Sequence, residues 1–160
     1  MSKKFFDIST STQNFSTTLL RDDLIPALTG MDGNILYWAG KKLARDFVLN
    51  KDEELSVFFD KAGWGELKRV KSQKNTQTFE LSGLVIQTRL QLSNNANFLL
   101  EAGFLAETIQ NQLGNLTEAI VTSTKKDTVT ILVKIDWDSR GQHEELEQDN
   151  IINLLENEDQ

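Results

Sequence analysis

The chain has 160 residues, of which 39% are hydrophobic, and a formal net charge of -7 at pH 7. This length suits one domain with a single core, and no stretch approaches the roughly 20 consecutive apolar residues of a membrane-spanning helix, so we expect a cytoplasmic protein. The chain has no cysteine and one histidine, His143, which excludes disulfides and cysteine-ligated zinc and leaves no multi-histidine metal site, so we expect no cofactor.

The negative charge is concentrated at one end. Residues 141–160 contain seven acidic residues and no Lys or Arg, so the rest of the chain is balanced. A balanced body lacks the basic surface that binds nucleic acid or anionic lipid, and we expect neither partner nor stable membrane insertion. We predict that the acidic tail, residues 139–160, is mostly disordered. The alternative is that its apolar cluster, Ile151 to Leu155, docks as a short helix.

The first half of the chain reads as helical. Residues 1–16 are rich in Ser, Thr and Asn and are predicted to form a flexible arm. A first helix is predicted over residues 17–28, bent or broken at Pro26. Apolar residues at helical spacing predict a second helix over residues 34–49 and a third that ends at Gly63.

The second half mixes strands with one helix. Phe79 and Leu81, then Ser82-Gly83, then Leu84, Ile86 and Leu90 are typical of two strands joined by a tight turn. A helix is predicted over residues 98–113, and a second hairpin over residues 116–124 and 128–137. The sequence therefore predicts a single α+β domain, residues 17–138, whose antiparallel sheet is built from two hairpins with helices packed on one side.

Three glycine-containing aromatic blocks carry a resemblance to known proteins. They are Leu36 to Arg45, Ala62 to Gly65 and Leu100 to Glu107. In this order and spacing they resemble the YslB-type proteins of Gram-positive bacteria, over about residues 24–138. More distantly, the order of elements is similar to the 4-vinyl reductase domain and the TRAPP trafficking subunits. That resemblance implies a fold that binds small molecules or assembles, usually as a dimer. Because the chain has no cysteine, any ligand in such a fold would be held noncovalently.

Trp38 occupies an unexpected position on its helix. At about 100° per residue, Leu36, Leu43 and their apolar neighbours face the core, whereas Trp38 projects nearly opposite, beside Lys42 and Arg45. Two interpretations remain open. Trp38 is covered within the chain, under the N-terminal arm or another helix, with Lys42 stacked on it. Otherwise, Trp38, Lys42 and Arg45 form the interface of a homodimer.

Candidate ligand-binding residues come from the same blocks. We single out Tyr37, Lys41, Trp64, Glu101 and Phe104. Three of them have a simpler interpretation as well: Trp64 as a core residue, Phe104 as part of a helix covered on two faces, and Glu101 as a carboxylate favoured by the helix dipole. Glu101 could also pair with Lys41 or Arg45.

Three further residues have structural interpretations. Gly40 and Gly103 favour close packing of two helices. Arg89 is predicted to lie on the solvent side of the sheet.

No nucleophile, base and orienting group stand at a recognisable spacing, and no phosphate-binding loop is present. We therefore expect a non-enzymatic, homodimeric binding or assembly module that holds a small hydrophobic ligand. The alternative is an enzyme that acts on a small molecule in a pocket lined by Tyr37, Lys41, Arg45 and Glu101.

Overall fold

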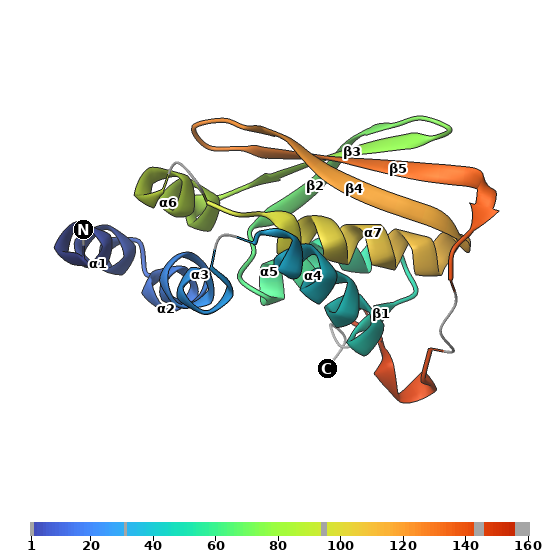
Figure 1. Cartoon of the computed structure of the whole chain (residues 1–160), viewed down its shortest axis with the longest axis horizontal. Coiled ribbons are helices and arrows are strands. Elements are labelled where there is room, and N and C mark those ends of the chain that lie inside the picture. The colour runs from blue at the N-terminus through green and yellow to red at the C-terminus, as the bar shows by residue number, and fades with distance from the viewer. Residues whose placement is uncertain (1, 31, 94–95, 143–145, 156–160) are drawn as a thin grey trace.

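A computed structural model describes residues 2–30, 32–93, 96–142 and 146–155. It is an α+β fold in which a four-stranded antiparallel sheet of order β2-β3-β5-β4 is covered by helices on one side (Figure 1). The predicted fold class is confirmed.

Two hairpins build the sheet. β2 (Glu66–Ser72) pairs with β3 (Thr76–Ser82), and β4 (Asn115–Thr124) pairs with β5 (Val129–Arg140). The hairpins join where β3 pairs with β5, with Phe79 opposite Ile131. Alternate residues of β5 are buried against the helices, from Val129 to Ile135, because side chains alternate between the faces of a strand.

The first predicted hairpin is wrong in its second strand. Residues 84–92 form a helix, α6 (Leu84–Leu92), and the partner of β3 is β2. Gly83, at φ +102, turns the chain out of the sheet. The apolar residues at 84, 86 and 90 alternate like a strand, yet Ile86 and Leu90 are also four apart, as on one helix face. A short pattern of this kind does not distinguish the two structures.

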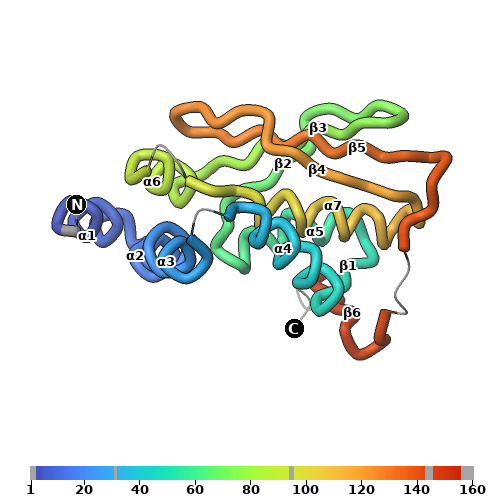
Figure 2. Tube along the Cα trace, viewed as in Figure 1, coloured from blue at the N-terminus to red at the C-terminus, as the bar shows by residue number. Residues whose placement is uncertain are grey.

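Two helices cross at close range. α7 (Leu99–Leu113) lies under the sheet, and α4 (Asn34–Asp46) packs against it (Figure 2). A Cβ added at Gly40 would lie 2.1 Å from the Leu100 carbonyl oxygen, and one at Gly103 would lie 2.0 Å from that of Tyr37. The prediction that these glycines permit tight helix packing is confirmed.

The N-terminal helices lie at one end of the molecule, beside α6 (Figure 1). They are α1 (Ser2–Ser11), α2 (Phe15–Thr18), a π-helix η1 (Leu19–Leu24) and α3 (Ile25–Thr29). Pro26 stands in the first turn of α3, where a missing N–H is tolerated, so the chain stays helical through the π-turn. The boundaries predicted for the arm, the domain and the tail remain a prediction, but most of residues 1–16 is helical.

The C-terminal tail differs from its expectation. A short 3-10 helix, η2 (Gln148–Asn150), leads into β6 (Ile151–Ile152), which pairs in parallel with β1 (Val48–Leu49). The apolar cluster thus docks, as a strand rather than the short helix considered from the sequence. His143 lies outside the described residues.

Aromatic residues fill the core next to α7. Phe58 and Phe59 of α5 (Glu54–Lys61) surround Phe104 together with Trp64. The rings of Phe58 and Phe104 stack with centroids 4.5 Å apart, and Trp64 meets Phe104 edge to face at 5.4 Å. These contacts make Trp64 and Phe104 part of the packed core.

Candidate functional site

The central helix α7 carries two buried carboxylates, Glu101 and Glu107. They stand six positions apart, which at about 100° per residue places them on different sides of the helix. Each carboxylate has its own set of cationic partners.

Glu101 joins two arginines from distant parts of the chain. Arg21 Nη2 lies 2.7 Å from Glu101 Oε1 and donates to Oε2 at 2.9 Å, and Arg89 Nη1 donates to Oε1 at 3.3 Å. All three side chains are buried. The sequence-based pairing of Glu101 with Lys41 or Arg45 is wrong, because those two cations lie elsewhere.

Arg89 of α6 is the best-connected member. Its Nε donates to Asp22 Oδ2 at 2.9 Å, and its Nη2 donates to Asp22 Oδ1 at 3.1 Å and to the Asn97 carbonyl at 2.9 Å. The guanidinium lies 4.4 Å from the centre of the Phe98 ring. The predicted solvent-facing position of Arg89 is wrong, because the residue belongs to a helix and points into the molecule. We call Arg21, Asp22, Arg89 and Glu101 the Glu101 cluster.

Arg21 is incompletely bonded. Its Nε and Nη1 are buried and have no hydrogen-bond partner among the described residues. Burial lowers the pKa of the Arg21 guanidinium from its ordinary value, and the neighbouring Glu101 carboxylate opposes that shift. The cluster contains two cations and two carboxylates, so it brings no net charge into the interior.

Glu107 forms the second cluster with α4. Lys41 Nζ lies 3.5 Å from Glu107 Oε2, and Arg45 Nη1 lies 3.4 Å from Oε1. Lys41 is buried, whereas about a third of the Arg45 side chain is exposed (32%). We call these three residues the Glu107 cluster.

Tyr37 and Gln110 accept hydrogen bonds from two backbone N–H groups of β4, an edge strand of the sheet. The Ala119 N–H donates to the Tyr37 hydroxyl at 3.1 Å, and the Thr117 N–H donates to Gln110 Oε1 at 3.1 Å. Unpaired edge groups invite pairing with another chain, and these side chains occupy two of them. Burial raises the pKa of Tyr37 above its ordinary value.

The candidate ligand-binding residues separate into different environments. Trp64 and Phe104 lie in the aromatic core, Glu101 in its cluster, and Tyr37 and Lys41 on α4. A cavity of about 660 Å³ lies between α6 and the turn joining β4 to β5, and one of about 240 Å³ lies beside α5 and β2. Neither of these two cavities is lined by the five candidates. Ligand binding by these residues stays a prediction.

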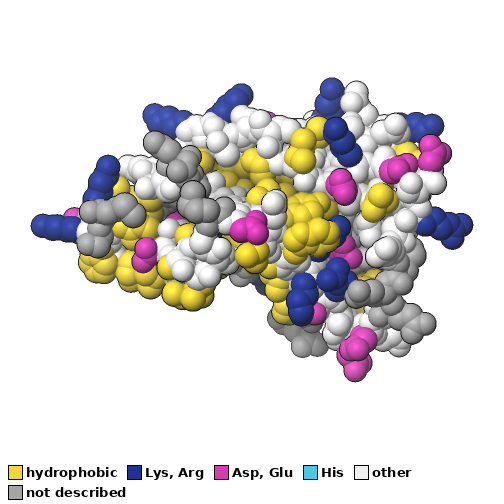
Figure 3. Space-filling model, viewed as in Figure 1, with side chains coloured by type: hydrophobic (Ala, Val, Ile, Leu, Met, Phe, Trp, Pro, Cys, Tyr) yellow, Lys and Arg dark blue, Asp and Glu magenta, His cyan; other side chains and the backbone are white. Residues whose placement is uncertain are grey.

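The outward face of α4 is apolar at its centre. Trp38 is 64% exposed and Ile35 is 46% exposed. Hydrophobic side chains gather near this helix in the middle of the face shown in Figure 3. The interpretation in which another part of the chain covers Trp38 is therefore wrong. The cation near its ring is Lys41, with Nζ 5.5 Å from the ring centre, while Lys42 pairs with Asp46.

The described part of the chain shows neither a group of metal ligands nor a membrane-spanning helix. Within the described ranges, no three His, Asp or Glu side chains are grouped so that they could hold a metal ion. Every helix in those ranges is too short or too polar to cross a membrane.

Comparison with known proteins places these features in a family. A family model described as a protein of unknown function, DUF2507, matches residues 14–134. The chain belongs to the DUF2507 family. A relative, the uncharacterized protein YslB of Bacillus subtilis (strain 168), is 38% identical over 127 residues, which cover 79% of this chain and 85% of the relative. The resemblance to YslB-type proteins is confirmed.

The DUF2507 match begins before η1 and ends within β5, so it includes both charged clusters. Sequence reasoning missed Arg21, Asp22 and Arg89. A signal was present, because Arg21, Asp22 and Asp23 interrupt a helical run of Leu and Ile, and Arg89 adjoins Leu90 within the partly apolar residues 84–92. Such residues are seldom buried unless they are paired.

Proposed function

We propose that this protein is a non-enzymatic assembly module that forms a symmetric dimer through the outward face of α4. The observation that carries the proposal is the exposure of Trp38, 64%, on a helix held firmly against α7. Trp and Arg are enriched among the residues that dominate binding energy at interfaces, and Arg45 lies on the same helix.

The surroundings of Trp38 suit pairing with a second copy. A two-fold interface brings the same patch together twice, so the patch has to be complementary to itself. Lys42 and Asp46 place both signs of charge beside the apolar centre, and Arg45 adds a partly exposed cation. These groups would form a polar rim around Trp38 and Ile35.

The proposal includes a small hydrophobic ligand held noncovalently near the aromatic core of Phe58, Trp64 and Phe104. The distant likeness to the 4-vinyl reductase domain and TRAPP subunits belongs to this part of the proposal. The enzyme alternative is weaker, because its four residues are engaged separately: Tyr37 with Ala119, Lys41 and Arg45 with Glu107, and Glu101 with two arginines.

Sedimentation equilibrium tests the dimer. We expect the unaltered protein to associate reversibly and Trp38→Ala to weaken the dimer by about thirtyfold, as for a hot-spot residue of at least ~2 kcal/mol. Trp137→Ala is the matched control, because Trp137 is also a half-exposed tryptophan but lies on β5. An unaltered protein that stays monomeric, or an undiminished dimer of Trp38→Ala, would contradict the proposal.

Native mass spectrometry of the purified protein tests the ligand. Extra mass on the protein that is lost on denaturation would support a bound small molecule and give its mass. A ligand-free dimer would leave the assembly proposal standing without the ligand.

A further inference from the structure

The N-terminal helical segment, residues 2–29, packs with its polar side chains inward. Its fully buried residues among those described are all polar: Ser9, Thr18 and Arg21. Five of its large apolar side chains are exposed instead, and Leu28 reaches 76%, while Phe5, Ile8, Phe15 and Ile25 are half-buried. The exposed set comprises Phe6, Leu19, Leu20, Leu24 and Leu28. Burial of apolar surface, which holds most helices in place, is therefore incomplete in this segment.

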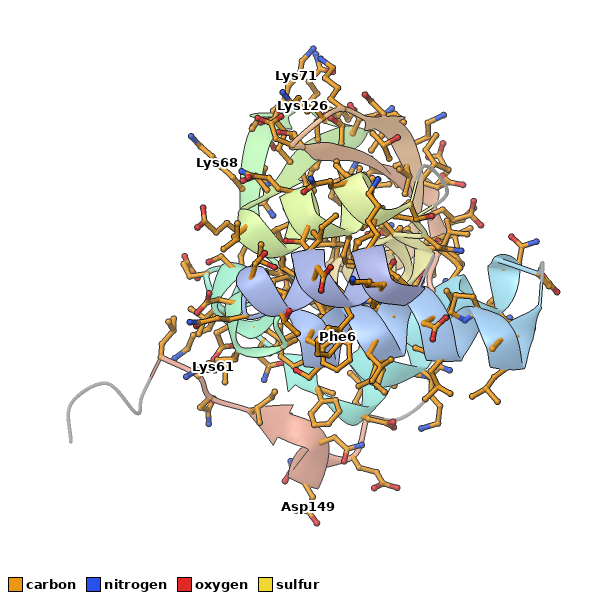
Figure 4. All side chains as sticks on the ribbon, turned by 90° about the vertical axis from the view of Figure 1, so that its left-hand side faces the viewer. Phe6, Lys61, Lys68, Lys71, Lys126 and Asp149 are labelled. Atoms are coloured by element: carbon orange, nitrogen blue, oxygen red, sulfur yellow. The ribbon has the colours of Figure 1, made fainter. Side chains whose placement is uncertain are left out.

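The figures show the same outward position of apolar side chains. Hydrophobic side chains line the lower edge of the N-terminal end in Figure 3. In Figure 4, Phe6 lies on the side of α1 opposite to Lys71 and Lys126, which stand at the top of the view, and its ring packs edge to face on Phe15 at 5.1 Å. Among the described residues of the segment, Ile25 is the one that packs against the core cluster.

Charged and polar contacts also hold the segment. Arg21 and Asp22, adjacent in the π-helix η1, bond to Glu101 of α7 and Arg89 of α6 respectively. The segment thus contributes one cation and one anion. The rest of the fold, which we call the body, contributes the matching anion, Glu101, and cation, Arg89. The Thr88 hydroxyl adds a hydrogen bond of 3.1 Å to that of Thr12. A π-turn is uncommon and frequently marks a functional position in a helix.

We propose that residues 2–29 form a cover that opens as a unit while α4, α7 and the sheet remain folded, and that the Glu101 cluster is its latch. When closed, the latch keeps four charges out of water, and two buried nitrogens of Arg21, Nε and Nη1, lack hydrogen-bond partners among the described residues. Opening returns these groups to water, which offsets much of the lost attraction. Gly30, at φ +66 and with open space around it, ends the segment and serves as the hinge.

Opening uncovers aromatic surface on the body. The Arg21 guanidinium, which moves with the cover, lies 6.0 Å from the centre of the Trp64 ring. Trp64 is buried, whereas Trp38 and Trp137, the other two tryptophans, are exposed. Trp64 therefore reports on the state of the cover.

Hydrogen exchange of the full chain, followed by mass spectrometry, tests the proposal. In the unaltered protein we expect residues 15–29 to exchange through a less costly opening than residues 34–46 and 99–113. Asp22→Asn keeps the shape of the side chain but removes the charge facing Arg89. We expect it to speed exchange in residues 15–29 about tenfold and to leave residues 99–113 unchanged.

The matched control is Asp52→Asn, which removes a carboxylate from the partly exposed Arg69–Asp52 pair, outside both the cluster and the proposed dimer face, and should change neither region. Equal acceleration of residues 15–29 and 99–113 by Asp22→Asn would mean that the segment unfolds with the core, which overturns the proposal. No acceleration in residues 15–29 would overturn it as well.

Quenching of Trp64 fluorescence by acrylamide gives an independent measurement. A Trp38→Phe, Trp137→Phe background leaves Trp64 as the only tryptophan. We expect Asp22→Asn in this background to raise quenching of Trp64, and equal quenching with and without the substitution would contradict an opening latch. Neither measurement depends on dimer formation, so its outcome is separate from that of the proposed function.

Discussion

The Glu101 and Glu107 clusters use the same chemistry on one helix but differ in completeness. Around Glu101, two arginines meet two carboxylates, and all four side chains are at most 7% exposed. Around Glu107, one carboxylate meets two cations, and Arg45 reaches solvent. The first cluster depends wholly on its internal partners, whereas water shares the stabilisation of the second.

The two clusters also join different parts of the fold. The Glu101 cluster connects η1, α6 and α7, and its three ion pairs span 80, 67 and 12 residues of sequence. The Glu107 cluster lies along the contact of α4 with α7, which glycines and apolar side chains already hold. We infer that the first cluster positions a segment and the second adds to a helix pair that packs well without it.

The largest expected effect is the difference between Glu101→Gln and Glu107→Gln. Loss of the Glu101 charge leaves buried Arg21 without its carboxylate partner and Arg89 with Asp22 as its remaining carboxylate, which should lower the free energy of unfolding by about 3–5 kcal/mol. Glu107→Gln should cost about 1–3 kcal/mol, because Arg45 can turn to solvent. Urea denaturation measures both.

Glu80→Gln, at an exposed position of β3, is the control for these substitutions and should change stability little. Equal losses for the two buried glutamates would remove the distinction between the clusters.

The glycines beside the Glu107 cluster give the next effect. Gly103→Ala and Gly40→Ala each introduce a Cβ within about 2 Å of a backbone oxygen of the facing helix. Overpacking of this kind should cost ~1–3 kcal/mol, despite the higher helix propensity of alanine. Thermal unfolding measures the loss, and Ser56→Ala, exposed on α5, is the control. Variants as stable as the unaltered protein would mean that α4 and α7 cross less closely.

The docked C-terminal tail contacts Arg45 of α4 and Glu54 of α5. Asn150 Nδ2 donates to the Arg45 carbonyl, and the Leu154 N–H donates to Glu54 Oε1. Removal of residues 148–160 should lower the free energy of unfolding by about 1–2 kcal/mol through these bonds and the β1–β6 pair. Removal of residues 156–160 alone retains the docked residues and serves as the control. An unchanged melting temperature would favour the disordered tail that its charge predicts.

The smallest expected effect is electrostatic and appears in the titration of Tyr37, the only tyrosine. Burial raises its pKa in the folded protein, and the Glu118 and Glu107 charges add to that shift. The unfolded chain therefore loses this proton first as pH rises. Tyr37 contributes stability that is present below its ordinary pKa, near 10.0, and is lost as pH rises through the folded value.

Glu107→Gln should move the absorbance titration of Tyr37 to lower pH, and Glu101→Gln should leave it in place. The same shift in both variants would show that it arises from loosened packing rather than from the Glu107 charge.

The helices and strands were predicted best where the pattern is long. The α4 and α7 patterns extend over three or more turns, and the β4–β5 hairpin alternates over two long strands, so local periodicity is sufficient there. The prediction for α6 was wrong, because nine residues with apolar side chains at 84, 86 and 90 fit a strand as well as a helix. The strand formed by Ile151 and Ile152 was not predicted, because two residues are too few to show a periodic pattern.

The sequence by itself determined the α+β class, the family, and the two glycines that let α4 meet α7, since these depend on periodicity, motif order and the absence of a side chain. Only the tertiary structure decided that Glu101 pairs with Arg21 and Arg89 and Glu107 with Lys41 and Arg45. Such pairs form across 62 to 80 residues of chain in most cases, and any acidic residue is locally compatible with any basic one. Their choice follows from how the helices pack, because burial of a charge is tolerated only where the fold brings its partner within bonding distance.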